Sequence, residues 1–108
     1  MEIKKKGSMQ EFLYRLQLVR GDMLQTGPTD SEQAVVAEHF AYLQGLDAQG
    51  VIILVGRTLT TDENTMGITI FRAESENAAR EIMNGDPAVK EGVMTATLYP
   101  FKVVLQGK

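Results

Sequence analysis

The amino-acid sequence predicts an α+β domain of the ferredoxin-like type, with the element order βαββαβ and an antiparallel sheet. Three observations support this class. Two segments with helical spacing of apolar residues separate strand-like segments, and the second and third strand-like segments follow one another without a helix between them. The 108 residues, 44% of them hydrophobic, suit one domain with one core. In such a motif both helices lie on one face of the sheet.

The first predicted strand, residues 12–19, alternates between apolar and mixed positions. Phe12, Tyr14 and Leu16 share one face, which is the period-two pattern of a half-buried strand. Residues 20–28 follow as a loop, because they contain two glycines and a proline.

The first helix is predicted from about residue 30 to residue 48. Thr29 and Glu32 match a capping box, in which the threonine side chain accepts from the backbone and the glutamate side chain reaches back. Apolar residues then recur with helical period, and Gly50 stands where a left-handed C-terminal cap is expected.

Two consecutive strands form the next predicted unit, a hairpin. Residues 51–55 are uniformly apolar and lie between glycines, which favours a central strand buried on both faces. A polar loop spans residues 58–65, and residues 66–72 alternate as the third strand.

A second helix and a fourth strand complete the predicted motif. Ser75 is the expected cap of the helix, which the sequence Gly-Asp-Pro at 85–87 breaks. Residues 93–99 form the fourth strand, which Pro100 is expected to end, and residues 101–105 are a candidate fifth edge strand.

The sheet face away from the helices is predicted to be apolar as well. Leu13 and Val19 lie on it, and the second strand is apolar on both sides. We therefore expect a second copy of the chain to cover this open sheet face, giving a homodimer.

Composition and charge exclude several functional classes. The chain has no cysteine and one histidine, so it supplies neither a thiolate nucleophile nor a cysteine-based or multi-histidine metal site. Its net charge of -3 argues against a nucleic-acid partner, and no apolar run is long enough for a membrane span. Residues 1–8 are interpreted as a basic extension that precedes a domain at 9–108, and not as a signal peptide. We accordingly expect a cytoplasmic protein that requires no cofactor.

The single histidine, His39, lies near the middle of the apolar stripe of the first helix. At about 100° per residue it falls between Val35 and Leu43 and away from Gln44. A histidine in such a position is usually a packed residue with one nitrogen satisfied. If a carboxylate orients one nitrogen in a dry pocket, the ring acts instead as a general base.

Asp86 is the strongest candidate for that carboxylate among the five aspartates. It follows a broken helix, precedes Pro87 and leads into the fourth strand. The same residues also fit a plain helix start, with Asp86 as the cap and Pro87 at the first helical position. The pattern alone favours the cap.

Several short segments are informative as a set. They are residues 38–46 around His39, the glycine-bounded strand 51–55, Asp86-Pro87, Gly92-Val93 and Pro100-Phe101. In this order and spacing they resemble the YCII-related (YciI-like) family over about residues 10–105. The resemblance implies a dimeric α+β barrel and a His–Asp pair at the active site, carried here by His39 and Asp86.

The resemblance also implies a pocket for a small molecule. The first loop is similar to a family segment that lines the pocket, which makes Arg20 and Met23 candidate substrate-binding residues. A glycine-proline pair often follows the second strand in the family, whereas here Gly56 is followed by Arg57. Arg57 is therefore either a cation for an anionic substrate or a solvated residue at a strand end.

Two functions of different class follow from these features. The first is a small acid–base enzyme of the lyase or isomerase type that acts on a small cyclic or carbonyl compound through His39 and Asp86, with Arg20 or Arg57 holding an anionic group. The alternative is a non-catalytic module that binds a small ligand or serves as a dimerising accessory. Heme degradation or monooxygenation is weaker, because it rests on the fold alone and fold does not specify function.

Overall fold

The computed structural model describes residues 9–107, and within them four strands form one antiparallel sheet in the order β2-β3-β1-β4. The strands are β1 (Gln10–Leu18), β2 (Ile52–Arg57), β3 (Gly67–Ala73) and β4 (Met94–Phe101). The helices are α2 (Met23–Thr26), α3 (Asp30–Ala48), α4 (Glu76–Gly85) and α5 (Pro87–Lys90). Apart from the short helices α2 and α5 this is the predicted βαββαβ order, so the ferredoxin-like α+β class is confirmed.

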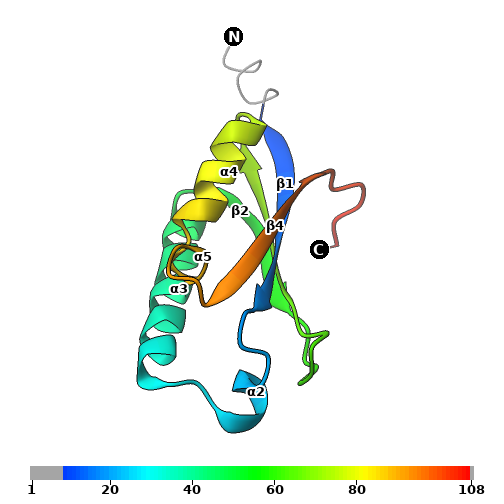
Figure 1. The fold of residues 1–108 in the computed structure, drawn as a ribbon. Helices are drawn as coiled ribbons and strands as arrows, with labels where there is room; N and C mark the ends of the chain where they lie inside the picture. The colour runs from blue at the N-terminus through cyan, green and yellow to red at the C-terminus, as the bar shows by residue number, and fades with distance from the viewer. Residues whose placement is uncertain (1–8, 108) are drawn as a thin grey trace.

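Helices cover only one face of the sheet. In Figure 1, α3, α4 and α5 lie on one side of the strands, and no helix lies over the other side. Helix α3 contacts β2 and α5, whereas α4 contacts β3 and β4. The short helix α2 lies beyond the end of β1, where the chain turns toward α3 (Figure 1). The long helix that carries the histidine therefore passes α5 at its middle and continues toward β2.

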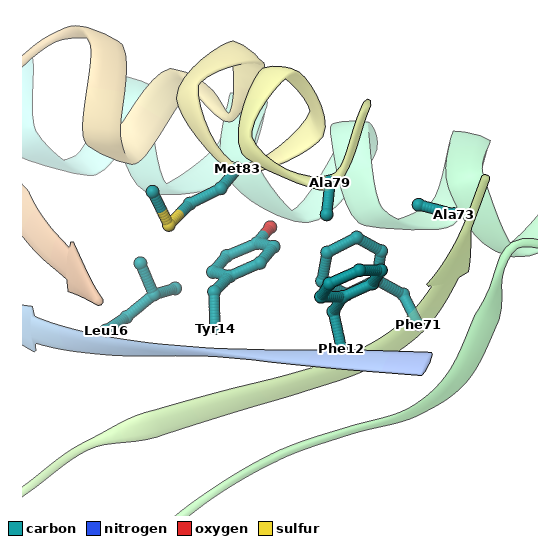
Figure 2. Packing of buried hydrophobic residues seen from close by; sticks show 7 residues of the cluster. All are labelled: Phe12, Tyr14, Leu16, Phe71, Ala73, Ala79 and Met83. Carbon is teal, nitrogen blue, oxygen red and sulfur yellow. The ribbon is translucent and has the colours of Figure 1, made fainter. Parts of the chain in front are cut away.

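Strand β1 is central and carries the core. It pairs with β3 on one side and with β4 on the other. As predicted, Phe12, Tyr14 and Leu16 are buried beneath the helices. Figure 2 shows these side chains and that of Phe71 pointing into the layer between sheet and helices. The rings of Tyr14 and Phe71 pack edge to face, with their centroids 5.5 Å apart. Each large apolar side chain buried in this way stabilises the fold by about 1.5–3 kcal/mol, and this packing fixes where the Tyr14 hydroxyl points.

Side-chain caps begin both long helices where the sequence predicts. Glu32 N donates to Thr29 Oγ1 at 3.1 Å and Thr29 N donates to Glu32 Oε1 at 2.8 Å, which is the reciprocal capping box of α3. Gly50 ends α3 with a φ of 78°, a conformation that favours glycine. Ser75 Oγ accepts from Ala78 N at the start of α4.

The prediction that residues 51–55 form a central strand buried on both faces is wrong. Strand β2 lies at an edge of the sheet, and its last four residues, 54–57, are exposed. The crossover through α3 places β2 two strand positions away from β1, and the β2–β3 hairpin brings β3 between them. A uniformly apolar run indicates that both faces of a strand are suited to burial. It does not indicate which strands are its neighbours in the sheet.

The end of the chain also differs from the prediction. Strand β4 continues to Phe101, so Pro100 does not end it, and residues 102–107 form no fifth strand. Proline is tolerated here because β4 is an edge strand, on which one side of the backbone has no ladder partner. The predicted loop 20–28 contains the four-residue helix α2. The predicted basic extension, residues 1–8, lies outside the described residues.

Two absences hold for residues 9–107. None of the helices there combines the length and the apolar character that crossing a bilayer requires. No three side chains among the histidine, aspartates and glutamates of this range gather as a ligand set for a metal ion.

Candidate active site

A cavity of about 500 Å³ lies between α2, α3 and the helix-facing side of the sheet. Its wall is mostly apolar and includes Leu16 of β1, Met23 of α2, Leu43 of α3, Val55 of β2 and Met94 of β4. Small-molecule sites commonly have volumes of roughly 300–1,000 Å³ and a few polar groups in an apolar wall. The cavity is thus of a suitable size and character for a small organic ligand.

His39 lies in the wall of this cavity, halfway along α3. Its side chain is only 14% exposed. The Nδ1 atom lies 2.7 Å from Asp86 Oδ1 and 2.8 Å from Asp86 Oδ2. Within residues 9–107 the Nε2 atom has no hydrogen-bond partner and remains available to a ligand of the cavity.

Close packing of α3 against the junction of α4 and α5 brings these two residues together. Tyr42, three residues after His39, donates a hydrogen bond from its hydroxyl to the carbonyl oxygen of Ile82 at 2.7 Å. A Cβ atom on Gly85 would lie 2.9 Å from that same hydroxyl oxygen, so only glycine fits here without a shift. The residue that follows Gly85 is Asp86, which explains why His39 can reach it.

Asp86 serves as a helix cap and as the histidine's partner at the same time. Its side chain is fully buried, and its Oδ1 atom accepts from Ala88 N at 3.0 Å as the cap of α5. The two interpretations that the sequence left open therefore hold together. A carboxylate in this position loses hydration on burial, and the donors of Ala88, His39 and Tyr14 compensate for that loss.

Tyr14 is the third member of the network, and the sequence analysis placed it in the core without giving it a role. Its hydroxyl donates to Asp86 Oδ2 at 2.8 Å. Burial, together with the nearby Asp86 carboxylate, raises the pKa of Tyr14 well above its usual range, so the hydroxyl remains a donor. The available signal was a tyrosine at an inward strand position, because a buried tyrosine hydroxyl needs a polar partner.

The network determines which nitrogen of the histidine carries a proton. The Asp86 carboxylate already accepts from Tyr14 and Ala88, so it acts as an acceptor toward His39 as well. The Nδ1 atom is then the donor, and in the neutral ring Nε2 keeps its lone pair. An imidazole held in this way can accept a proton from a molecule in the cavity and return it.

Arg20 does not join this group. Its guanidinium donates to both carboxylate oxygens of Glu32, at 2.9 Å and 2.6 Å, and also to Asp22, Thr26 and the carbonyl oxygen of Gly27. It is not part of the cavity wall. Arg20 thus ties the segment containing α2 to the start of α3, which the sequence pattern did not reveal because its partners lie up to 12 residues away.

The other two candidate substrate-binding residues do line the cavity. Met23 is buried and brings α2 against the cavity, and Arg57 is exposed where β2 ends. The wall also contains Phe40, which is 59% exposed and leaves part of the cavity open to solvent.

The comparisons with known proteins agree with this fold. The model of the YCII-related domain matches residues 14–102. A solved structure of 5-chloro-2-hydroxyhydroquinone dehydrochlorinase from Burkholderia phenoliruptrix, in complex with 2,5-dihydroxybenzoquinone, has 27% sequence identity and a TM-score of 0.64, and the match covers 85% of this chain and 93% of that one. No curated protein matches the sequence.

Two further solved structures match this chain over most of its length. An uncharacterised protein from Thermotoga maritima has 8% identity and a TM-score of 0.56, with coverage of 87% of this chain and 99% of that one. A dimeric ferredoxin-like protein from an uncultured marine organism has 14% identity and a TM-score of 0.47, with coverage of 97% of both chains. At these identities the likeness concerns the fold alone.

Proposed function

The chain belongs to the YCII-related family, and on that premise we propose that it is a small acid–base enzyme of the lyase or isomerase type. The observation that carries the proposal is the pairing of His39 Nδ1 with a fully buried carboxylate, Asp86, while the same ring lies in the wall of a ligand-sized cavity. The substrate class is a small cyclic or carbonyl compound.

In the proposed reaction, His39 Nε2 takes a proton from a carbon or hydroxyl group of the bound compound. The electron pair of the broken bond forms a new double bond in the substrate. In a lyase this expels a leaving group with its bonding electrons, and in an isomerase the same imidazolium returns the proton to another atom. The Asp86 carboxylate orients the ring and stabilises the imidazolium, as a carboxylate does in other histidine-based sites. Neither outcome needs an oxidant or a reductant.

The similarity to the dehydrochlorinase supports this class of chemistry. That enzyme removes hydrogen and chlorine from a hydroxylated ring, and its structure holds a dihydroxybenzoquinone. Loss of hydrogen chloride needs a group that takes the proton while chloride leaves with the electron pair. His39 is the only histidine of this chain and is suited to that role.

We also propose that a second copy of the chain covers the open sheet face. In the register of the sheet, Leu13 of β1 lies opposite Ile70 of β3 and Tyr99 of β4, on the side away from the helices. Tyr99 is 41% exposed in the single chain, and Leu54 of β2 is 53% exposed. These exposed apolar side chains on a helix-free face favour pairing with an identical face. The cytoplasmic location stays a prediction from the sequence.

The test is proton exchange and turnover in matched variants. Wild-type protein is incubated with hydroxylated and chlorinated ring compounds, beginning with 5-chloro-2-hydroxyhydroquinone, while chloride release and deuterium uptake from D₂O are followed. We expect His39→Gln to lower the rate by roughly 10³-fold or more, because it removes the base. Glu38→Gln, an exposed neighbour on α3, serves as the control and should keep the rate. Equal rates in His39→Gln and wild type would favour the alternative, a non-catalytic binding module.

A further inference from the structure

The charge on the cavity wall points to the kind of ligand that fits it. Among the described residues, the wall contains no carboxylate, and its polar side chains are His39, Arg57, Thr65 and Thr69. The Thr65 hydroxyl is engaged with the carbonyl oxygen of Thr60 at 2.6 Å. That leaves the imidazole and the guanidinium as the groups with charge, or potential charge, that face a ligand.

Arg57 has no acidic partner among residues 9–107. No carboxylate of that range lies within ion-pair distance of the guanidinium. The guanidinium donates a long hydrogen bond, of 3.4 Å, to the carbonyl oxygen of Thr58. This differs from Arg20, whose donors are fully used by Glu32 and the loop before α3. A guanidinium beside an apolar cavity can therefore offer its donors to an anionic group of the ligand.

The strand register places this cation on the helix-facing side of the sheet, beside the cavity. Tyr14, whose hydroxyl bonds to the partner of His39, lies opposite Thr69, and Thr69 lies opposite Val55. Arg57 is two residues further along β2 and, like Val55, lines the cavity. Alternate residues of a strand share one face, so Arg57 lies on the same face as Val55 and borders the same cavity as His39.

We infer that the site takes a single-ring compound bearing an anionic oxygen, and that Arg57 is the specificity-determining residue that binds this oxygen while the reacting atom lies at His39. The inference rests on the proposed function and adds the substrate's charge to it. An enolate, phenolate or ring carboxylate has the required chemistry. The apolar residues of the same wall, which include Met23 and Val55, suit the faces of the ring.

The experiment compares binding of an anion and of its neutral analogue, without turnover. The probes are 2,5-dihydroxybenzoquinone, whose acidic hydroxyls are ionised at neutral pH, and its neutral dimethyl ether. Calorimetric titration of wild type should show a preference for the anion, and Arg57→Gln should weaken binding of the anion by about 5- to 30-fold while the ether changes by no more than about twofold. Arg80→Gln, an equal loss of charge on the exposed face of α4, is the control and should change neither.

Three results would overturn the inference. They are equal binding of both probes to wild type, an unchanged preference for the anion in Arg57→Gln, and no saturable binding of the anion to wild type. Because Arg57 is exposed, its variant is expected to fold, and Arg57→Lys should restore part of the preference. Binding by His39→Gln separates the two proposals. If that variant binds the anion but no longer turns over the compounds that wild type converts, the acid–base function stands whatever Arg57 does.

Discussion

Replacing Asp86 with asparagine should move the proton of the neutral His39 ring from Nδ1 to Nε2. Asparagine caps a helix about as well as aspartate, so its amide oxygen is expected to keep the bond from Ala88 N. The amide NH₂ then takes the place of Oδ2, which faces Tyr14 and the imidazole. The Oδ1 atom, 2.7 Å from Nδ1, already accepts from Ala88 N, so we expect Nδ1 to pair with the NH₂ group as an acceptor. Nε2 would then present an N–H in place of a lone pair.

The contacts allow the size of the effect to be worked out. Two bonds to the carboxylate, from Tyr14 at 2.8 Å and from His39 at 2.7 Å, become bonds to a neutral group. Each loses about 1 kcal/mol, so the free energy of unfolding should fall by roughly 1–3 kcal/mol, a part of the 5–15 kcal/mol typical of a domain. Asp86→Ala would also remove the cap and leave two buried donors unpaired, at a cost of roughly 3–6 kcal/mol. Asparagine is therefore the sharper variant.

The assay uses the fact that His39 is the only histidine. One set of ring ¹⁵N signals reports the tautomer at a pH where the ring is neutral, and urea unfolding reports the stability. We expect protonated Nδ1 in wild type, protonated Nε2 in Asp86→Asn, and a loss of turnover of roughly 10³- to 10⁴-fold, the size known for a wrong tautomer in serine proteases. Protonated Nε2 in wild type, or the same tautomer in both proteins, would refute the reasoning.

Three further substitutions test other parts of the molecule. Tyr14→Phe removes a buried donor to Asp86 and should lower the free energy of unfolding by about 1–2 kcal/mol in urea, whereas no change would mean that the bond does not form. The Arg20 guanidinium and the capped backbone lower the pKa of Glu32 to about 2, so its stabilising effect is present above pH 4.5 and is lost as the pH falls toward 2. The urea midpoints of wild type and Glu32→Gln should thus differ at neutral pH and converge over that range, and a constant gap would contradict this. Ile70→Asp places a charge on the open sheet face and should raise the dimer dissociation constant at least about 100-fold in analytical ultracentrifugation, unless another surface forms the dimer.

Local sequence patterns predicted the helices and strands themselves better than they predicted which strands lie side by side in the sheet. The alternation of β1 and the capping box of α3 are short-range features, and both are present as predicted. The position of β2 in the sheet depends on a crossover and a hairpin, and the residue pattern of 51–55 predicts neither. Pro100 likewise looked like a strand end because the pattern could not show that β4 is an edge strand, where proline fits.

The candidate site shows the same division. A helical wheel placed His39 toward the sheet, and the structure brings it to the cavity and to Asp86. Arg20 was a candidate because it lies close in sequence to Met23. In the structure its side chain donates to Glu32, and this contact depends on how the segment containing α2 folds back. Tyr14 is 72 residues from Asp86 in the sequence, so only the folded sheet could reveal their bond.

The double role of Asp86 bears on how firmly the histidine is held. A capping residue has its side chain fixed by the backbone of the helix that it begins, and here Ala88 N and Pro87 at the first helical position hold that geometry. The carboxylate therefore cannot follow the imidazole if the ring moves, and it instead imposes one orientation on His39. Cap and partner looked like alternatives in the sequence because each accounts for an aspartate before a proline. In the folded chain, capping is what makes Asp86 a rigid partner for the histidine, which is the property that a general base needs.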